Sequence, residues 1–178
     1  MIDGAERVTL VDGLSLVLPA LLVVAALRDL ISFTIPNWIS LSLAAAFAVT
    51  ALVSGLPLAD IGVHTLVGVA ALAAGFGLFA LGWVGGGDAK LLGATALWLG
   101  WPGVGPFLAA TALAGGVLTG LLLGLRSGFL GTWASHGPPW LARLARPGEP
   151  VPYGVAIAVG ALAVLPESLV WLALGHLR

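Results

Sequence analysis

Six apolar stretches divide the chain, and turn-forming residues separate them. We predict membrane-spanning helices near residues 11–27, 38–53, 61–83, 89–99, 107–125 and 153–174. An alternative is that the last one ends early at Pro166 and Glu167, which would leave residues 168–177 as a short interfacial helix. A crossing takes about 20 apolar residues, and shorter helices are tolerated inside a bundle. The pattern therefore predicts an all-α membrane protein: a polytopic bundle of about six transmembrane helices forming a single domain over residues 1–178.

Composition supports the membrane assignment and excludes several functions. Hydrophobic residues make up 60% of the chain and charged residues 8%, whereas a soluble domain has about 25% charged residues. The net charge of −1 gives no bulk electrostatic hold on nucleic acid. The chain has no cysteine and its three histidines are far apart, so neither a metal site nor a cofactor is predicted.

The placement of positive charge predicts the orientation in the membrane. Acidic residues surround Arg7, whereas a secretory signal begins with a positive segment, so the first stretch should remain as a helix. With the N-terminus outside, the inner side receives most of the cations, namely Arg28, Lys90, Arg126, Arg143 and Arg146, and the outer side only Arg7 and Arg178. Residues 126–150 then form a cytoplasmic loop, which we expect to lie on membrane lipid. The alternative is that this loop covers a cavity.

Asp29 and Asp88 lie at the ends of apolar stretches and are the strongest candidates for function. An ionisable residue at the edge of the hydrocarbon is costly, which makes it a functional hypothesis by default. The helix after Asp88 rises only about 18–20 Å, less than the ~30 Å of hydrocarbon. If Trp98 and Trp101 anchor its outer end, Asp88 lies below the cytoplasmic surface. The glycine run 85–87 before it then implies a small polar cavity on that side.

Both aspartates also have structural interpretations. Asp88 is suited to cap a helix N-terminus, and Asp29 to pair with Arg28 or Lys90 at the interface. The run around Asp88 lacks the spacing of a phosphate-binding loop and of a dinucleotide fingerprint.

Two further patterns concern packing. His64 lies four residues after Asp60, which predicts that the two pair on one helix face. Small residues at regular spacing let helices approach closely, within one chain or between the chains of a homo-oligomer. They occur at Gly68, Gly75 and Gly82 in the third stretch and at Gly116, Gly120 and Gly124 in the fifth.

Three motifs follow one another along the chain: Asp29 with Ile35-Pro36-Asn37, then Gly85-x-Gly87-Asp88-Ala89-Lys90, then Pro152-Tyr153-Gly154. As an ordered set they resemble the type IV prepilin peptidases, polytopic aspartic peptidases of the GxGD class, over essentially the whole chain. The chain is similar to the short form associated with tight-adherence (Flp-type) pili, because it lacks the cysteine-bearing insert of the enzymes that also N-methylate the pilin. Residues 30–34 are less basic than the usual family stretch.

The resemblance implies a membrane aspartic endopeptidase that removes the leader peptide of Flp-type prepilins, at the inner face of the bacterial cytoplasmic membrane and without a cofactor. N-methyltransferase activity is not expected. Asp29 and Asp88 would be the catalytic pair, one ionised to activate water and the other protonated to polarise the scissile carbonyl. The remaining motif residues would bind substrate or support the site: Pro36, Asn37, Gly85, Gly87, Lys90, Pro152, Tyr153 and Gly154.

Two other classes stay open. A small proton-coupled transporter or a pilus-assembly scaffold would also carry membrane aspartates, although transporters often show internal repeats and midplane sites, neither of which is visible here. An intramembrane protease of the presenilin or signal-peptide-peptidase kind shares GxGD, but it has more spans and a Tyr-Asp string at its first aspartate.

Overall fold

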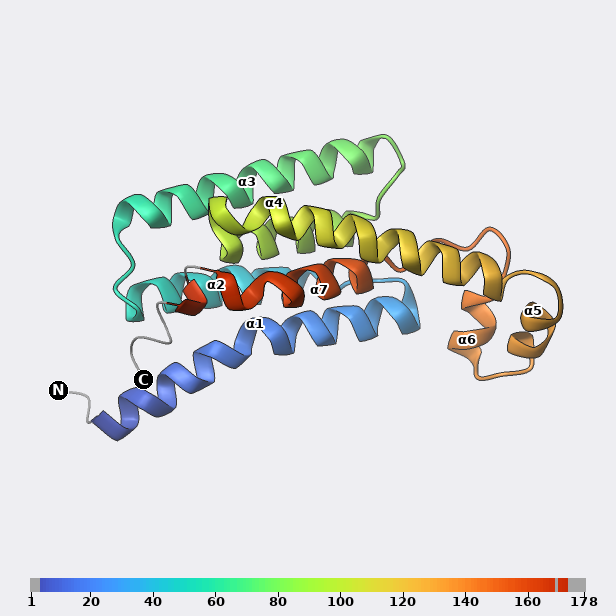
Figure 1. Ribbon diagram of the computed structural model, residues 1–178, viewed down its shortest axis with the longest axis horizontal. Helices are drawn as coiled ribbons and strands as arrows, with labels where there is room; N and C mark the ends of the chain where they lie inside the picture. The colour runs from blue at the N-terminus through green and yellow to red at the C-terminus, as the bar shows by residue number, and fades with distance from the viewer. Residues whose placement is uncertain (1–3, 169, 173–178) are drawn as a thin grey trace.

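The computed structural model describes residues 4–168 and 170–172, with side chains from residue 13 onward except 128, 129 and 167. The regular elements in this part are all helical, which confirms the predicted all-α class. They are α1 (Gly4–Ser32), α2 (Asn37–Val53), α3 (Leu58–Ala80), α4 (Gly86–Leu125), α5 (Gly128–Ser135), α6 (Pro139–Leu144), α7 (Tyr153–Val164) and a 3-10 turn, η1 (Leu165–Glu167). The long helices run along one axis, and α5 and α6 form a small lobe at one end of it (Figure 1).

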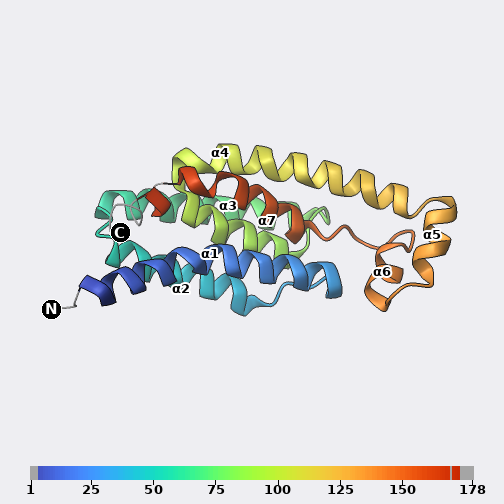
Figure 2. The ribbon, with the colours of Figure 1, turned by 60° about the horizontal axis from the view of Figure 1, so that its bottom comes forward.

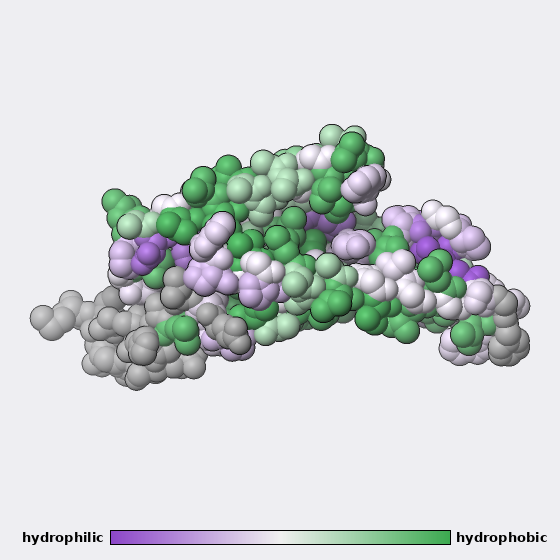
Figure 3. Space-filling model, turned by 45° about the horizontal axis from the view of Figure 1, so that its top comes forward, coloured by the Kyte–Doolittle hydropathy of each residue, from purple (hydrophilic) through white to green (hydrophobic). Residues whose placement is uncertain are grey.

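Length and apolar character identify membrane spans. Three helical segments within the described residues are long and apolar enough to cross a bilayer: Gly13–Ser32, Leu58–Ala80 and Gly86–Leu125. The helices α2 and α7 are apolar but shorter. Apolar residues cover much of the elongated body, and strongly hydrophilic residues gather mainly toward its ends (Figure 3). The chain is therefore a polytopic membrane protein.

The helix α4 consists of two arms that meet at Gly100. This residue has φ 64° and ψ −169°, a conformation that is essentially restricted to glycine. The chain reverses there, so that the second arm (residues 101–125) folds back along the bundle (Figure 2). The two arms correspond to the helices predicted near 89–99 and 107–125.

A buried histidine fills the space beside this reversal. A side chain at Gly100 would place its Cβ 2.6 Å from Nε2 of His64. The His64 ring stacks on Phe47 at 5.5 Å, and its Nδ1 lies 2.8 Å from the carbonyl oxygen of Leu97. The predicted pairing of His64 with Asp60 is wrong, because the ring turns into the core instead of along its own helix.

The first arm of α4 (residues 86–99) is the centre of the bundle and is buried on nearly all sides. Trp98 is only 3% exposed and its indole N–H donates to the carbonyl oxygen of Leu43 at 2.8 Å. Its predicted role as an interfacial anchor is therefore wrong, whereas Trp101, at the turn, is exposed. The helix α1 contributes one buried stripe at helical spacing, made of Ser15, Leu18, Leu22, Ala25 and Asp29.

Only some of the small residues serve packing inside the chain. Gly68 lies against Leu97 and Gly75 against Ala89, so that α3 and α4 approach closely. A Cβ at Gly116, Gly120 or Gly124 would meet nothing within 4 Å among the described residues. These three glycines therefore do not pack closely against another helix among the described residues. Their contact with a second chain stays a prediction.

The last apolar stretch ends early. The helix α7 stops at Val164, and the 3-10 turn that follows contains Pro166, which cannot continue a helix. The predicted short interfacial helix at residues 168–177 lies largely outside the described residues. The two arginines predicted on the outer side also lie outside the description, which omits the side chain of Arg7 and all of Arg178.

Candidate active site

A cavity of about 270 Å³ lies where α1 ends and α4 begins. Its lining residues are Asp29, Phe33, Thr34, Ile35, Gly85, Gly86, Gly87 and Asp88. The structure therefore brings the two candidate aspartates to one cavity, although 59 positions separate them in the chain (88 − 29). The polar cavity predicted beside Asp88 is present, and Asp29 forms its opposite wall.

Asp29 reaches the cavity because it is the last member of the buried stripe of α1. Its side chain is 5% exposed, and its Oδ2 accepts a 2.7 Å hydrogen bond from the backbone N–H of Gly154. The first N–H groups of a helix have no partner within that helix, so Asp29 caps the N-terminus of α7, which begins at Tyr153. The pairings expected with Arg28 or Lys90 are not found among the described residues.

Asp88 lies in the first turn of α4 and is 9% exposed. The helix begins at Gly86, so Gly85 is the N-cap and Asp88 the third helical residue. The Gly85 N–H donates to Asp88 Oδ2 at 3.2 Å. Asp88 is thus not the N-cap itself but folds back onto it, which corrects the sequence interpretation. Its other oxygen, Oδ1, is buried and has no hydrogen-bond partner among the described residues.

The motif glycines allow the walls of the cavity to approach one another. A Cβ at Gly154 would lie 2.7 Å from Cδ1 of Ile35 and 2.9 Å from Oδ2 of Asp29. A Cβ at Gly87 would lie 3.1 Å from Cβ of Ile35, and one at Gly85 would lie 2.9 Å from Oδ2 of Asp88. Ile35 therefore fits between α4 and α7, where any larger residue at positions 87 or 154 would displace it.

The other motif residues lie beside the cavity and do not line it. Lys90 Nζ donates to Asn37 Oδ1 at 2.9 Å, linking α4 to the start of α2. Pro36 is the N-cap residue of α2 and Pro152 that of α7. Tyr153 packs on the second arm of α4, where a Cβ at Gly115 would lie 2.9 Å from its hydroxyl. These residues lie at or near the starts of α2, α4 and α7.

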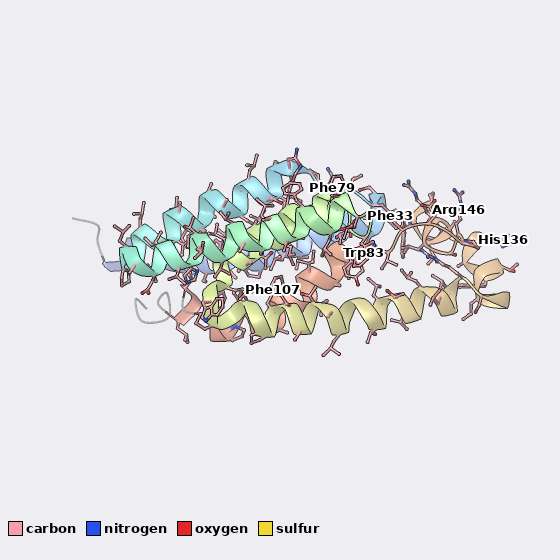
Figure 4. All side chains as sticks on the ribbon, turned by 90° about the horizontal axis from the view of Figure 1, so that it is seen from above. Phe33, Phe79, Trp83, Phe107, His136 and Arg146 are labelled. Carbon is pink, nitrogen blue, oxygen red and sulfur yellow. The ribbon has the colours of Figure 1, made fainter. Side chains whose placement is uncertain are left out.

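Phe33 and Ile35 line the cavity and Arg143 contacts Phe33, although the sequence analysis named none of them as a site residue. Phe33 is a non-glycine residue at φ 52°, where it ends α1 through a hydrogen bond from its N–H to the carbonyl oxygen of Asp29. Its aromatic ring marks the end of the bundle that faces the α5–α6 lobe (Figure 4). Asp29 and Pro36, which flank Phe33 in the sequence, drew attention to this segment. The left-handed backbone of Phe33 itself cannot be predicted from the residue pattern.

The α5–α6 lobe contacts one residue of the cavity lining, because the guanidinium carbon of Arg143 in α6 lies 5.2 Å from the centre of the Phe33 ring. Arg126 holds the lobe, since its side chain donates to the carbonyl oxygens of Leu144 at 2.9 Å and Pro150 at 3.1 Å. Trp133 is 63% exposed and remains available for lipid. The alternative role of residues 126–150, covering a cavity, thus has direct contacts in its favour.

Two carboxyl groups in one small, largely buried cavity can divide acid–base work on a water molecule, provided that one is ionised and the other protonated. The described residues contain no group of three or more His, Cys, Asp or Glu side chains able to hold a metal ion. The chemistry that the cavity itself offers is therefore that of a carboxyl pair.

Residues 16–120 match the family model described as the type IV leader peptidase family. The matched region contains both aspartates and the first two motifs, and it ends before Pro152. The comparison with curated proteins found no significant match, and neither did the comparison with solved structures.

Proposed function

The chain belongs to the type IV leader peptidase family, and from this premise we propose that it removes the leader peptide of Flp-type prepilins. Family membership implies aspartic peptidase activity and prepilin substrates. The observation that supports this chain as an active member is the cavity shared by Asp29 and Asp88.

The hydrogen bonds suggest how the two carboxyls divide the work. Asp29 accepts a short bond from the N-terminus of α7, and such a position stabilises a negative charge. Asp88 has a longer bond and an oxygen without a partner among the described residues. We assign Asp29 as the base and Asp88 as the protonated partner.

In the proposed reaction, Asp29 takes a proton from water while the oxygen of that water adds to the scissile carbonyl carbon. Asp88 donates a hydrogen bond to the carbonyl oxygen and stabilises the charge that develops there. The carbon–nitrogen bond then breaks, the leaving nitrogen receives the proton, and the products are a carboxylic acid and an amine. One water is consumed for each peptide bond.

The position of the cavity fits a substrate anchored in the membrane. The end of α1, the start of α4 and the start of α7 lie at the same end of the bundle, next to the α5–α6 lobe (Figures 1 and 2). With six spans and the N-terminus outside, this end faces the cytoplasm, where the leader of a prepilin begins. The apolar helix of the prepilin then lies in the cytoplasmic membrane, with the scissile bond at the depth of the two aspartates.

The purified chain, incubated with a Flp-type prepilin in detergent or vesicles, tests this proposal by mass spectrometry of the products. We expect one cut, a free leader and a mature pilin whose new N-terminal amine carries no methyl group. An intact prepilin beside correctly folded enzyme would contradict the assignment. A proton flux carried by the chain under the same conditions would favour the transporter alternative.

A further inference from the structure

A second polar cavity, of about 390 Å³, lies between the end of α4 and the α5–α6 lobe. One face of α5 and the chain from α6 to Pro147 complete its lining, and its charged or hydroxyl-bearing members are Arg126, Thr132, Ser135 and Arg146. We call it the arginine cavity. It shares no residue with the cavity that holds the two aspartates. The proposed peptidase chemistry therefore does not account for it.

The walls of the arginine cavity carry positive charge without a matching carboxylate. Residues 126–150 contain three arginines and one acidic residue, Glu149. Glu149 lies 3.9 Å from Arg143, which is not part of the cavity lining. Within the described part of the chain, no carboxylate lies within 4 Å of the side chain of Arg126 or Arg146. Two guanidinium groups without a counter-charge favour an anion as the ligand.

Arg126 is held in place before any ligand binds. Its Nε donates to the carbonyl oxygen of Leu144 at 2.9 Å, and its Nη2 to that of Pro150 at 3.1 Å. A guanidinium has five N–H groups, so these bonds leave three for a ligand, and the carbonyl acceptors do not neutralise the charge. Arg146 lies on the lobe (Figure 4) and is exposed. Its side chain makes no hydrogen bond to another described residue, so it is free to close on an anion.

The position of Arg126 relative to the membrane indicates which anion fits. The second arm of α4 is apolar to its end, and Arg126 is the first charged residue after Lys90. An arginine at the end of an apolar span reaches the headgroup level. Leu123 lies one turn earlier on the same side of the helix and is 62% exposed. A lipid with an acyl chain along Leu123 therefore has its phosphate at the level of Arg126.

We propose that the arginine cavity binds the phosphate group of an anionic phospholipid from the leaflet at this end of the bundle. Basic pockets beside the ends of membrane helices are suited to such headgroups. The sequence predicts only that residues 126–150 lie on lipid, whereas the cavity assigns one headgroup to one site. A bound lipid would join α4 to the α5–α6 lobe through Arg126 and Arg146. This binding does not depend on the peptidase function.

Native mass spectrometry of the purified chain in detergent tests the site with two lipids. Phosphatidylglycerol carries a net negative charge and phosphatidylcholine carries none, so we expect the chain to retain one phosphatidylglycerol in preference to phosphatidylcholine. Arg146→Gln should weaken phosphatidylglycerol binding about tenfold, as expected for the loss of a charge-assisted hydrogen bond. Arg28→Gln removes an exposed arginine at the end of α1 and is the matched control. Equal retention of both lipids, or equal effects of the two substitutions, would overturn the proposal.

Thermal unfolding gives a second readout and checks that the variants fold. Without lipid, Arg146→Gln should unfold at the same temperature as the wild type, because the side chain makes no contact that the variant loses. Phosphatidylglycerol should raise the midpoint of the wild type and of Arg28→Gln, since a ligand that binds the folded state stabilises it. The midpoint of Arg146→Gln should rise less. An equal rise in all three proteins would contradict a site at Arg146.

Glycerol 3-phosphate and inorganic phosphate distinguish a lipid headgroup from a free phosphate compound. We expect neither to displace phosphatidylglycerol at equal concentration, because the acyl chain adds contact along Leu123, which is exposed. Displacement by either compound at equal concentration would assign the arginine cavity to a free phosphate compound and overturn the lipid proposal. Cleavage of a prepilin, or its failure, bears on the proposed function alone, because the two cavities have no residue in common.

Discussion

The backbone N–H of Gly154 donates a 2.7 Å hydrogen bond to Oδ2 of Asp29, across 125 positions of sequence. This bond ties the end of α1 to the start of α7 and sets the direction of one carboxyl. The first turn of α4 sets the other, through the bond from Gly85 to Asp88. The carboxyl pair is thus positioned by helix termini.

Gly154→Ala should slow the reaction strongly while leaving the protein folded. The new methyl group would overlap Cδ1 of Ile35 and Oδ2 of Asp29, and the carboxyl must move. A misplacement of a catalytic group by about 1 Å can lower the rate on the order of 100-fold. We therefore expect kcat to fall by about 10- to 100-fold. Gly124→Ala, where nothing lies within 4 Å, is the control, and equal activity of the two variants would contradict the role of Gly154.

Gly100→Ala should destabilise the bundle. Its backbone conformation costs a non-glycine residue about 1–3 kcal/mol, and the methyl group would also overlap the His64 ring. Gly62→Ala in α3 meets nothing within 4 Å and should stabilise by about 0.5–1 kcal/mol, as expected of alanine in a helix. Thermal unfolding in detergent measures both, and an unchanged midpoint for Gly100→Ala would contradict the reversal of α4 at this residue.

Arg143→Ala should weaken the action of the protein on its substrate without affecting folding. The variant loses the contact between the guanidinium and the Phe33 ring. Such a contact is worth about 0.5–1 kcal/mol at exposed sites, so the loss in kcat/KM should be no larger than about two- to fivefold. Arg146→Ala removes the same charge from the same loop and is the control, so a matching loss there would indicate a general charge effect.

Much of the fold could be predicted because membrane helices have a simple signature. From the apolar stretches and the turn residues between them, the sequence analysis predicted α1, α2, α3, both arms of α4 and α7. The early end of α7 was one of two alternatives, and its 3-10 turn at Pro166 supports the shorter helix. The direction of single side chains could not be predicted, since Trp98 and His64 turn into the core through contacts that depend on the neighbouring helices.

The residues that line the candidate cavity could be predicted only in part. The two aspartates and the motif glycines stand out because charge and glycine runs are unusual in apolar sequence. Ile35 gave no such signal, because an isoleucine in a membrane protein is unremarkable until Gly87 and Gly154 are seen to pack against it. The contact between Arg143 and Phe33 depends on how the α5–α6 lobe folds back, which charge and hydropathy do not determine.

Processing of a Flp-type prepilin in membranes by the wild type, Asp29→Asn, Asp88→Asn and Asp60→Asn tests the central claim most directly. Asp60 lies in the first turn of α3, at the end of the bundle away from the cavity, and serves as the matched acidic control. Acid–base catalysis by a positioned side chain contributes about 10²–10⁴-fold, so the proposed mechanism predicts that the wild type and Asp60→Asn release the leader. Neither cavity variant should do so, although all four proteins insert equally. Normal processing by Asp29→Asn or Asp88→Asn would contradict the two-aspartate mechanism.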